Sequence, residues 1–386
     1  MQPKNETVLV IDDEDFVRDT ITGYLEDSGI EVIEAENGRQ GVELFDQHHP
    51  ALVLCDLRMP KMDGLEVLNH VMEQRPDTPF IVLSGAGVMK DVVEALRLGA
   101  SDYLFKPLAD LAMLEHSIRR NLERSRLRQD VETYRAELEA TYSQLQSDLR
   151  AGRKIQQKML PEKPLLRQGW VFDYIIAPSH IMSGDFVDFF PLSEHETFYY
   201  LVDVSGHGVS SAIITMVIKQ FVEIARRDFA HLNDPSIFTL DKFLSRLNQQ
   251  LIAQDLGRHA TVFAGVLNTE ADTMTYCSAA QFPPPIVSVA DGCEVIPSDG
   301  MAVGLFPDAQ YHMFERTLSG VEGFFFCTDG ILEIIQESSL SAKENLIKQT
   351  VEAGNRSISS FSEAIGLNGV EGLPDDITIF TINRTR

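Results

Sequence analysis

The sequence has few cysteines, few basic residues for its acidic content and no long apolar run. Its four cysteines show no metal-like spacing, which indicates buried thiols in a reducing compartment rather than a disulfide framework or a zinc site. No apolar run is long enough to cross a membrane. Charged residues begin at Lys4, so no signal region is visible. We therefore expect a cytoplasmic protein without a membrane segment.

The charge balance is strongly acidic. The chain has 58 Asp and Glu residues but only 33 Lys and Arg residues, which gives a formal net charge of −25. A surface of this sign repels a phosphate backbone, and no basic recognition helix is visible, so we expect no direct nucleic-acid partner. Excess carboxylates can also form divalent-metal sites, and the placement of the acids decides between these interpretations.

The 386 residues are too many for one core, and the chain divides into three segments, which we place at 1–125, 126–160 and 161–386. The first segment alternates expected strands and helices, which predicts an α/β domain with a parallel sheet covered on both faces. The expected strands are Val8–Ile11, Val32–Ile33, Ala51–Cys55, Phe80–Leu83 and Tyr103–Phe105. The expected helices are Val17–Ser28, Gln40–His48, Leu65–Arg75 and Val88–Leu98.

The second segment belongs to a stretch from Asp110 to Leu160 that lacks proline and is rich in charged residues. Its apolar residues follow a coiled-coil-like spacing: Leu127, Val131, Tyr134, Leu138, Leu145 and Leu149. We expect this linker helix to form a homodimer. The alternative is a helix packed on its own domains, because Thr141 and Asp148 fall on the seam and Gly152 interrupts it.

The third segment consists of short β-like runs around two long helical stretches. This pattern predicts an α+β domain with largely antiparallel strands. The expected strands are Val171–Ile176, Phe198–Val204, Val262–Leu267, Met274–Ser278, Phe324–Thr328 and Ile377–Ile382, and the expected helices are Ser210–Ala230 and Leu240–Ala253.

Acidic residues stand at the ends of the N-terminal strands. Asp12 and Asp13 follow the first strand, Asp56 ends the third, and Ser84 and Lys106 close the fourth and fifth. These ends meet at one edge of a parallel sheet, and three carboxylates together require a cation, so we expect an Mg²⁺ site. A carboxylate there could form an acyl phosphate whose oxygens the lysine and the hydroxyl would hold.

Residues 5–125 resemble the response-regulator receiver family, with Asp56 in LCDLRMPKMDG as the family's phospho-acceptor. The resemblance implies a flavodoxin-like (βα)5 fold and a sensor histidine kinase or a small phosphodonor as partner. The implied Mg²⁺ ligands are Asp12, Asp13, Asp56 and the backbone carbonyl of Arg58. Ser84 and Tyr103 would be the hydroxyl and aromatic switch residues, and Lys106 would be the family's lysine.

A second set of acids stands at expected strand edges in the third segment. Most of them lie beside glycine: Asp185 in Met182-Ser183-Gly184-Asp185, Asp203 in Asp203-Val204-Ser205-Gly206-His207-Gly208, and Asp329 in Thr328-Asp329-Gly330, while Asp375 and Asp376 precede the last strand. This placement suggests a carboxylate cage for two divalent metals. Such a pair could bind a phosphoryl oxygen and activate water, which predicts hydrolysis of a phosphate ester.

Residues 150–386, beginning with Ile155-Gln156-Gln157-Lys158-Met159-Leu160-Pro161, resemble the bacterial branch of the PP2C-type Ser/Thr phosphatases found among sporulation and sigma-factor regulators. The resemblance implies a PP2C-like α-β-β-α sandwich with two Mn²⁺ or Mg²⁺ ions. Asp203 would bridge the ions, and the Val204 carbonyl would help to hold one. Asp329 and Asp375 would complete the other site, Asp185 would act through water, and Asp376 is a further candidate ligand.

Two departures from this family remove no metal carboxylate. The chain has Ser183-Gly184-Asp185 where the family usually has Gly-Gly-Asp, and Ala279-Ala280-Gln281-Phe282-Pro283 where many members have Ala-Gly-His-Pro-Pro. We therefore expect activity. His207 is either a phosphate contact or general acid, or a loop residue tolerated near the metals.

Two functions follow from these resemblances. The first is a protein phosphatase controlled by Asp56 phosphorylation, most simply upward, that acts on a phosphorylated STAS-type anti-sigma-factor antagonist. The second is an adaptor, because residues 84–111 also resemble the RssB family, which delivers the stationary-phase sigma factor to an ATP-dependent protease. In such adaptors the phosphatase-like domain can be a docking surface only. The retained Asp185, Asp203, Asp329 and Asp375 favour catalysis.

Overall fold

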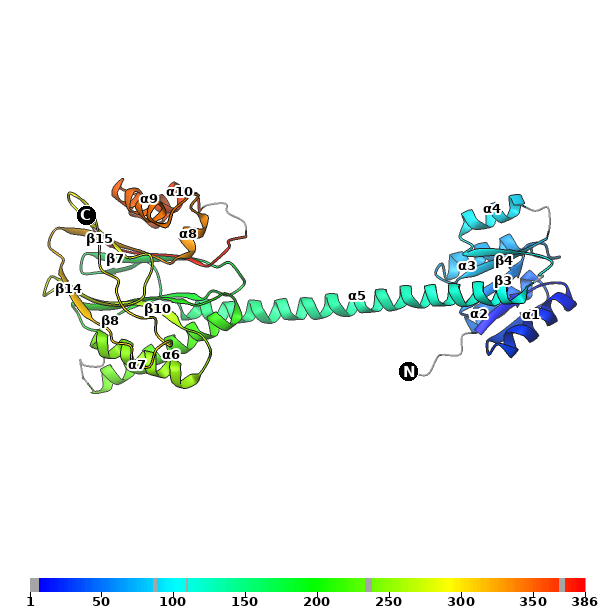
Figure 1. Ribbon diagram of the computed structural model, residues 1–386, viewed down its shortest axis with the longest axis horizontal. Coiled ribbons are helices and arrows are strands. Elements are labelled where there is room, and N and C mark those ends of the chain that lie inside the picture. Colours follow the sequence, from blue (N-terminus) through cyan, green and yellow to red (C-terminus); the bar gives the residue numbers. More distant parts are fainter. Residues whose placement is uncertain (1–6, 86–88, 109, 233–237, 368–371, 386) are drawn as a thin grey trace. The chain divides into compact units, whose positions relative to one another are not determined.

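The structure, a computed structural model, describes residues 7–85, 89–108, 110–232, 238–367 and 372–385. The chain forms two compact units, Met1–Tyr142 and Ser143–Arg386, both visible in Figure 1. The boundary lies inside helix α5 (Leu111–Met159), within the segment that the sequence assigns to a linker. In the described part of the chain, no helix is both long enough and apolar enough to cross a membrane.

The N-terminal unit contains a five-stranded parallel sheet in the order β2-β1-β3-β4-β5. Its strands are β1 (Thr7–Ile11), β2 (Glu31–Ala35), β3 (Leu52–Asp56), β4 (Phe80–Ser84) and β5 (Asp102–Phe105). Its other helices are α1 (Asp15–Asp27), α2 (Gly38–His48), α3 (Gly64–Gln74) and α4 (Met89–Leu98). The predicted flavodoxin-like α/β fold is confirmed, although Val88, the expected start of the fourth helix, lies outside the described residues.

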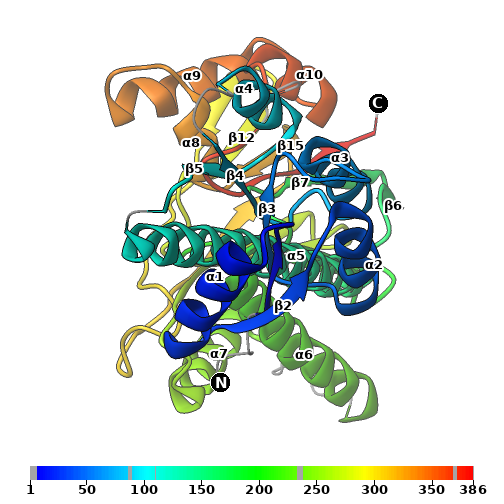
Figure 2. The same cartoon turned by 90° about the vertical axis from the view of Figure 1, so that its right-hand side faces the viewer.

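Two separate cores hold the helices on opposite faces of this sheet. Helices α2, α3 and α4 lie on one face, and helices α1 and α5 lie on the other (Figure 2). Local sequence fixes where helices begin: Asp63 and Glu66 form a capping box at α3, and Asn37 caps α2. The sheet is therefore buried on both faces, and its polar chemistry is confined to the strand ends.

The C-terminal unit contains two antiparallel sheets, β14-β11-β10-β9-β8 and β13-β12-β15-β16-β7-β6. The strands of the first sheet are β8 (Asp185–Pro191), β9 (Glu196–Val204), β10 (Ala260–Asn268), β11 (Thr273–Ala279) and β14 (Met313–Thr317). Those of the second are β6 (Leu165–Arg167), β7 (Trp170–Ala177), β12 (Ile286–Val289), β13 (Gly292–Val295), β15 (Val321–Cys327) and β16 (Ile377–Arg384).

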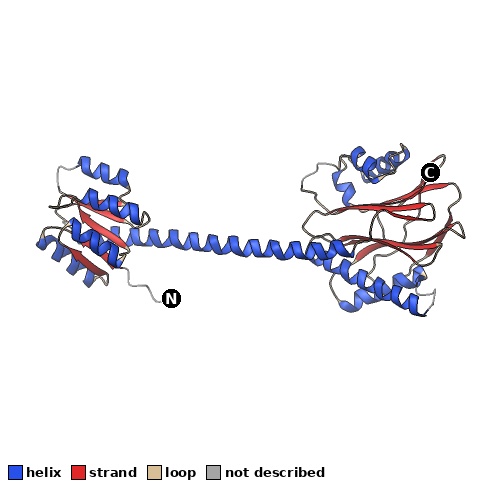
Figure 3. Cartoon of the chain, turned by 180° about the vertical axis from the view of Figure 1, so that it is seen from behind, coloured by secondary structure: helices blue, strands red, loops and turns tan. Residues whose placement is uncertain are grey.

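The two sheets form the inner layers of a sandwich with helices outside (Figure 3). An aromatic-rich core that includes Trp170, Tyr199 and Phe380 fills the space between the sheets. Helices α6 (Val209–Leu232) and α7 (Leu240–Gln254) cover the first sheet, while α8 (Gly330–Ile334), α9 (Leu340–Glu352) and α10 (Ile358–Ala364) cover the second. The predicted α-β-β-α sandwich is confirmed.

Strand β8 is absent from the sequence prediction because two acids interrupt its apolar pattern. Six of its seven residues are buried, Asp188 among them. The Lys219 ammonium of α6 lies 2.7 Å from Asp188 Oδ2 and 2.6 Å from Glu223 Oε1, which compensates the buried charge. Asp188 can therefore be buried in this strand because Lys219, 31 residues away in the chain, pairs with it.

Helix α5 changes surroundings along its length. Leu114, Ile118 and Leu122 are buried in the N-terminal core, and Gln156 is buried in the C-terminal unit. Between them, Leu127, Val131, Tyr134, Leu138 and Leu145 are more than half exposed. The predicted coiled-coil stripe is therefore an uncovered apolar face of this single chain.

Candidate functional sites

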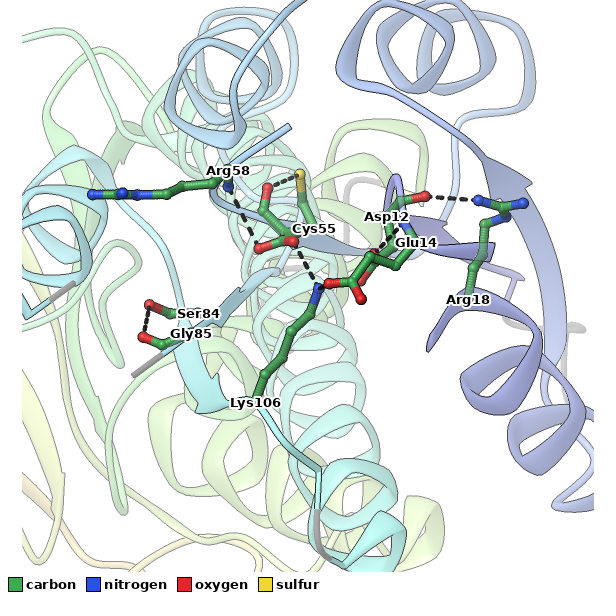
Figure 4. Close-up of polar contacts among 9 residues, drawn as sticks. Asp12, Glu14, Arg18, Cys55, Arg58, Ser84, Gly85 and Lys106 are labelled. Atoms are coloured by element: carbon green, nitrogen blue, oxygen red, sulfur yellow. Dashed lines mark hydrogen bonds and ion pairs between the residues drawn. The ribbon is translucent and has the colours of Figure 1, made fainter. Parts of the chain in front are cut away.

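The first site lies at the carboxyl ends of β1, β3 and β5. The Lys106 ammonium is 2.7 Å from Asp12 Oδ2 and 2.7 Å from Asp56 Oδ2 (Figure 4). One oxygen each of Asp12, Asp13 and Asp56 lies within 4.8 Å of the others, with Asp12 and Asp56 buried and Asp13 exposed. The structure thus brings together the acids and the lysine expected from the sequence, and this donor set fits a hard cation such as Mg²⁺.

Electrostatics at this site reflect burial and charge pairing. Burial raises the pKa of Asp12, although the Lys106 ammonium and the backbone N–H of Glu14 oppose the shift. Burial also disfavours the Lys106 ammonium, but hydrogen bonds to Asp12 and Asp56 outweigh it and raise the pKa of Lys106. Lys106 therefore stays charged and balances part of the acidic cluster.

The other expected receiver residues surround this cluster. The Arg58 backbone N–H donates to Asp56 Oδ1 at 3.4 Å, so the chain just after the acceptor turns back toward it. Ser84 is buried at the end of β4, where its hydroxyl donates to the Gly85 carbonyl at 3.4 Å. Tyr103 is 36% exposed and its ring packs edge-on against Phe105. The structure describes no contact from Ser84 or Tyr103 to Asp56 among these residues.

The second site lies where the two C-terminal sheets end together. Asp185 and Asp203 face each other in the β8–β9 pairing of the first sheet. Asp329 follows β15 and Asp375 and Asp376 precede β16, which are neighbours in the second sheet. Five acids from four strand ends and both sheets thus border one region, as the sequence predicts.

Mutual repulsion is the main electrostatic feature of this region after burial. Burial and the charges of Asp329 and Asp375 raise the pKa of Asp203 to about 8. Burial and Asp203 raise the pKa of Asp185, and burial and Asp375 raise that of Asp329. Carboxylates forced together in this way fit a site for divalent cations.

These acids do not converge on a single point. Among the described residues, three acids with ligand atoms all within 4.8 Å of one another occur in the N-terminal unit, and the acids of the second site do not meet this criterion. The C-terminal acids are spread more widely. The Val204 carbonyl oxygen lies next to the loop that carries Asp185, because a Cβ added at Gly184 would lie 3.1 Å from it.

Asp376 differs from the other acids because both of its carboxylate oxygens accept hydrogen bonds from the loop before Asp185. Oδ1 accepts from the Ser179 backbone N–H at 2.6 Å and from the Ser179 hydroxyl at 2.8 Å. Oδ2 accepts from the Gly184 backbone N–H at 2.6 Å. Asp376 therefore ties the loop before Asp185 to the start of β16, whether or not it also contacts a metal.

Three further residues hold the acids in place, and the sequence alone assigned them no role. The Thr328 hydroxyl donates to Asp185 Oδ2 at 2.7 Å and accepts from the Thr378 N–H, which links the two sheets. Gly330 is required because a Cβ there would overlap the Asp376 carbonyl. In the sequence, Thr328 and Gly330 stand beside Asp329, and Thr378 stands two residues after Asp376.

Gln156 links the end of α5 to the second site. Its amide donates to the Ser183 carbonyl at 2.7 Å and to the Thr215 hydroxyl at 3.1 Å, and it accepts from the Ser183 N–H at 3.2 Å. In the sequence, Gln156 lies in the stretch Ile155–Pro161, with which the resemblance to the phosphatase family begins. The loop that carries Asp185 is thus bonded directly to α5.

His207 is exposed in the loop after Asp203. Its ring stacks on His180 of the β7–β8 loop, with centroids 4.3 Å apart and an interplanar angle of 9°. The two loops that border the acids therefore also meet through a pair of imidazoles.

Comparisons with known proteins agree with this division. The family model "Response regulator receiver domain" matches residues 8–119, and "Stage II sporulation protein E (SpoIIE)" matches residues 193–385. The Regulator of RpoS of Escherichia coli K12 is 26% identical over 273 residues, which cover 70% of this chain and 80% of that protein. The chemotaxis protein CheY of Listeria monocytogenes is 39% identical over 109 residues, which cover 28% of this chain and 92% of that protein.

Among solved structures, a response regulator receiver domain protein from Clostridium thermocellum is 31% identical, with a TM-score of 0.31, and the match covers 31% of this chain and 97% of that one. The sporulation family model spans half of the chain, and the receiver model precedes it without overlap. The chain therefore belongs to the stage II sporulation protein E family and is a response regulator in which a receiver domain precedes a PP2C-like domain, homologous to the Regulator of RpoS.

Proposed function

We propose that the C-terminal domain is a metal-dependent protein serine/threonine phosphatase controlled by the receiver. The observation that carries this proposal is the meeting of Asp185, Asp203, Asp329 and Asp375 at the ends of two sheets. These carboxylates repel one another: after burial, the charges of Asp329 and Asp375 are the main causes that raise the pKa of Asp203 to about 8. A domain that served only as a docking surface would not need this cluster of carboxylates.

We assign the residues of this site as follows. Asp203 would contribute to the sites of two Mn²⁺ or Mg²⁺ ions, and the Val204 carbonyl would help to hold one of them. Asp329 and Asp375 would complete the other site, and Asp185 would act through water. Two such ions supply charge for the phosphoryl oxygens and activation of water. The chain itself keeps the acids in position: Thr328 orients Asp185, and Asp376 with Gln156 fixes the loop that precedes it.

In the receiver, we propose that Asp56 accepts a phosphoryl group from a sensor histidine kinase or a small phosphodonor. Asp12, Asp13, Asp56 and the Arg58 carbonyl would hold Mg²⁺. Lys106, already 2.7 Å from Asp56, would hold a phosphoryl oxygen, and Ser84 and Tyr103 would move in response. The limits proposed from the sequence remain our proposal for the receiver domain (1–125), the linker helix (126–160) and the PP2C-like domain (161–386).

The proposed substrate is a phosphoserine or phosphothreonine on a STAS-type anti-sigma-factor antagonist. A second candidate function is that of an adaptor which binds a sigma factor and presents it for regulated proteolysis. The similarity to the Regulator of RpoS over 70% of this chain favours this second function. Both functions fit a regulator that controls a sigma factor through one exposed C-terminal surface.

Hydrolysis of a chromogenic phosphate monoester separates the two functions. We expect the purified full-length protein to hydrolyse it with added Mn²⁺ and to stop when the ion is chelated. Asp203→Ala and Asp329→Ala should each reduce turnover at least about a hundredfold, because a lost metal ligand costs several kcal/mol of transition-state stabilisation. Folding is checked by circular dichroism. Wild-type turnover in Asp203→Ala would refute the assigned site, and an inactive wild type would leave the adaptor function.

A further inference from the structure

Arg258 is a half-buried cation that packs on the loop after Asp203. One guanidinium nitrogen donates to the Ser205 carbonyl at 2.9 Å, and another donates to the Ser210 hydroxyl at 3.1 Å. The guanidinium also lies against Gly206, where a Cβ would overlap it. Gly206, three residues after Asp203, therefore makes room for this arginine, in addition to allowing the positive φ of 80° at that turn.

The backbone around Arg258 is tied to the same loop. The Ser205 N–H donates to the His259 carbonyl at 2.9 Å, and the His259 N–H donates to the Ser205 hydroxyl at 3.2 Å. In the adjoining strands, Thr261 of β10 stands opposite Asp203 of β9. The start of β10 and the end of β9 are thus bonded to each other, and the guanidinium is held against the loop that follows Asp203.

The charge balance of the loaded site indicates why a cation is needed there. Two divalent ions would neutralise the four acids Asp185, Asp203, Asp329 and Asp375. A bound phosphomonoester then adds a dianion to a site that has no charge left to oppose it. A guanidinium carries five N–H donors in a planar fork that suits phosphate, and the bonds to Ser205 and Ser210 use two of them.

We propose that Arg258 is a substrate-positioning residue that binds the phosphoryl group of the phosphoester at the second site. This inference rests on the proposed phosphatase function and names the side chain that recognises its substrate class. Ser205 and Ser210 preorganise the guanidinium, so little side-chain freedom is lost when the phosphoryl oxygens bind. Because the product is also a phosphate dianion, Arg258 holds inorganic phosphate in the same way.

The test compares Arg258→Gln with wild type in the full-length protein at saturating Mn²⁺. Loss of a charge-assisted contact predicts a rise of about ten- to a hundredfold in KM for the chromogenic ester and in the inhibition constant of inorganic phosphate. Arg258→Lys keeps the charge but not the fork, so it should recover part of the phosphate affinity. The matched control is Arg227→Gln, which removes an exposed arginine from α6 and should behave as wild type.

A structural role would give a different pattern. If Arg258 only braces the loop, Arg258→Gln weakens Mn²⁺ binding and lowers the melting temperature, while the inhibition constant of phosphate at saturating Mn²⁺ stays unchanged. That result overturns the inference. If the wild type hydrolyses no ester, the proposed function fails on its own, and calorimetric titration of inorganic phosphate into the Mn²⁺-loaded protein still tests Arg258. Equal phosphate affinity in wild type and Arg258→Gln overturns it there as well.

Discussion

Asp375 and Asp376 are neighbours in sequence with different surroundings. Both oxygens of Asp376 accept backbone or hydroxyl hydrogen bonds from Ser179 and Gly184, whereas Asp375 borders Asp203 and Asp329 and raises their pKa values. From the sequence alone, both aspartates were candidate metal ligands. Their contacts separate a carboxylate that organises backbone from one that is available to a metal.

This difference gives a paired prediction with isosteric variants. Asp376→Asn places an amide against a backbone donor and should destabilise the C-terminal domain by about 2 kcal/mol. Asp375→Asn should leave the stability of the chelated protein within about 0.5 kcal/mol of wild type or above it, while Mn²⁺-dependent ester hydrolysis falls at least about a hundredfold. Thermal unfolding in a chelator and hydrolysis with Mn²⁺ provide the two readouts. Equal melting temperatures for the two variants would contradict the division of roles.

Sequence reasoning located the acids of both sites because each acid stands at the end of an apolar run. It assigned no role to the residues that hold the acids, since their partners are distant in the chain. Thr328 and Asp185 are 143 positions apart, and Gln156 and Thr215 are 59 apart. Nothing local in a sequence records such a pairing, whereas a strand-end aspartate beside a glycine is visible in three consecutive letters.

At the scale of elements, periodicity was sufficient for the receiver sheet and the linker helix, but it missed β12 and the helices α8, α9 and α10 of the C-terminal unit. It gave the five receiver strands and the linker helix with limits close to those observed. It failed at β8, whose acids Asp185 and Asp188 are buried and compensated by distant partners. Short edge strands such as β6 and β13, with three and four residues, also carry too little pattern to be recognised.

The end of α5 is the element most directly connected to the second site. Gln156→Leu keeps the side-chain size but removes three hydrogen bonds, two of them to the Ser183 backbone beside Asp185. We expect the Mn²⁺ concentration for half-maximal hydrolysis to rise about tenfold, as is typical when an outer-shell partner of a ligand is lost. Gln157→Leu, at the exposed neighbouring position, is the control. An unchanged Mn²⁺ requirement in Gln156→Leu would show that the loop holds Asp185 without the helix.

At the scale of the whole molecule, the exposed stripe on α5 predicts self-association. Five apolar side chains from Leu127 to Leu145 are more than half exposed in the single chain, and helical seams of this kind pair through a and d positions. We expect a dimer in sedimentation equilibrium at tens of micromolar. Leu138→Glu should shift the protein toward monomer, whereas Ala140→Glu, on the same exposed stretch but off the stripe, should not. A monomeric wild type would mean that the stripe meets some other surface.

Control by the receiver is the second prediction at this scale. An acyl phosphate on Asp56 would draw Lys106 and Ser84 toward it, and Tyr103 would take up the vacated space beside β5. Asp102 at the start of β5 pairs with Arg120 of α5 at 2.7 Å, so a shift of β5 acts directly on α5 within the N-terminal unit. We expect a beryllofluoride phosphate mimic to increase ester hydrolysis by about five- to a hundredfold.

The matched control for this coupling is Asp56→Asn, which cannot carry the mimic and should not respond. Measurements at saturating Mg²⁺ and Mn²⁺ exclude effects on metal loading of the receiver. Equal rates with and without the mimic in wild type would show that the two domains are uncoupled for this activity. A lower hydrolysis rate with the mimic would mean that phosphorylation of Asp56 inhibits the C-terminal domain.

The hydrogen bonds of Asp376 also bear on ancestry. They join Ser179 and Gly184 to the start of β16 without help from a metal, so selection for a folded domain is enough to preserve them. Asp203, Asp329 and Asp375 gain nothing for the fold from their mutual repulsion. A lineage that gave up hydrolysis and kept the domain for docking should therefore drift at these three positions first. Descendants that keep only the aspartate at position 376 would be those in which catalysis was lost. This chain keeps Asp376 together with Asp203, Asp329 and Asp375.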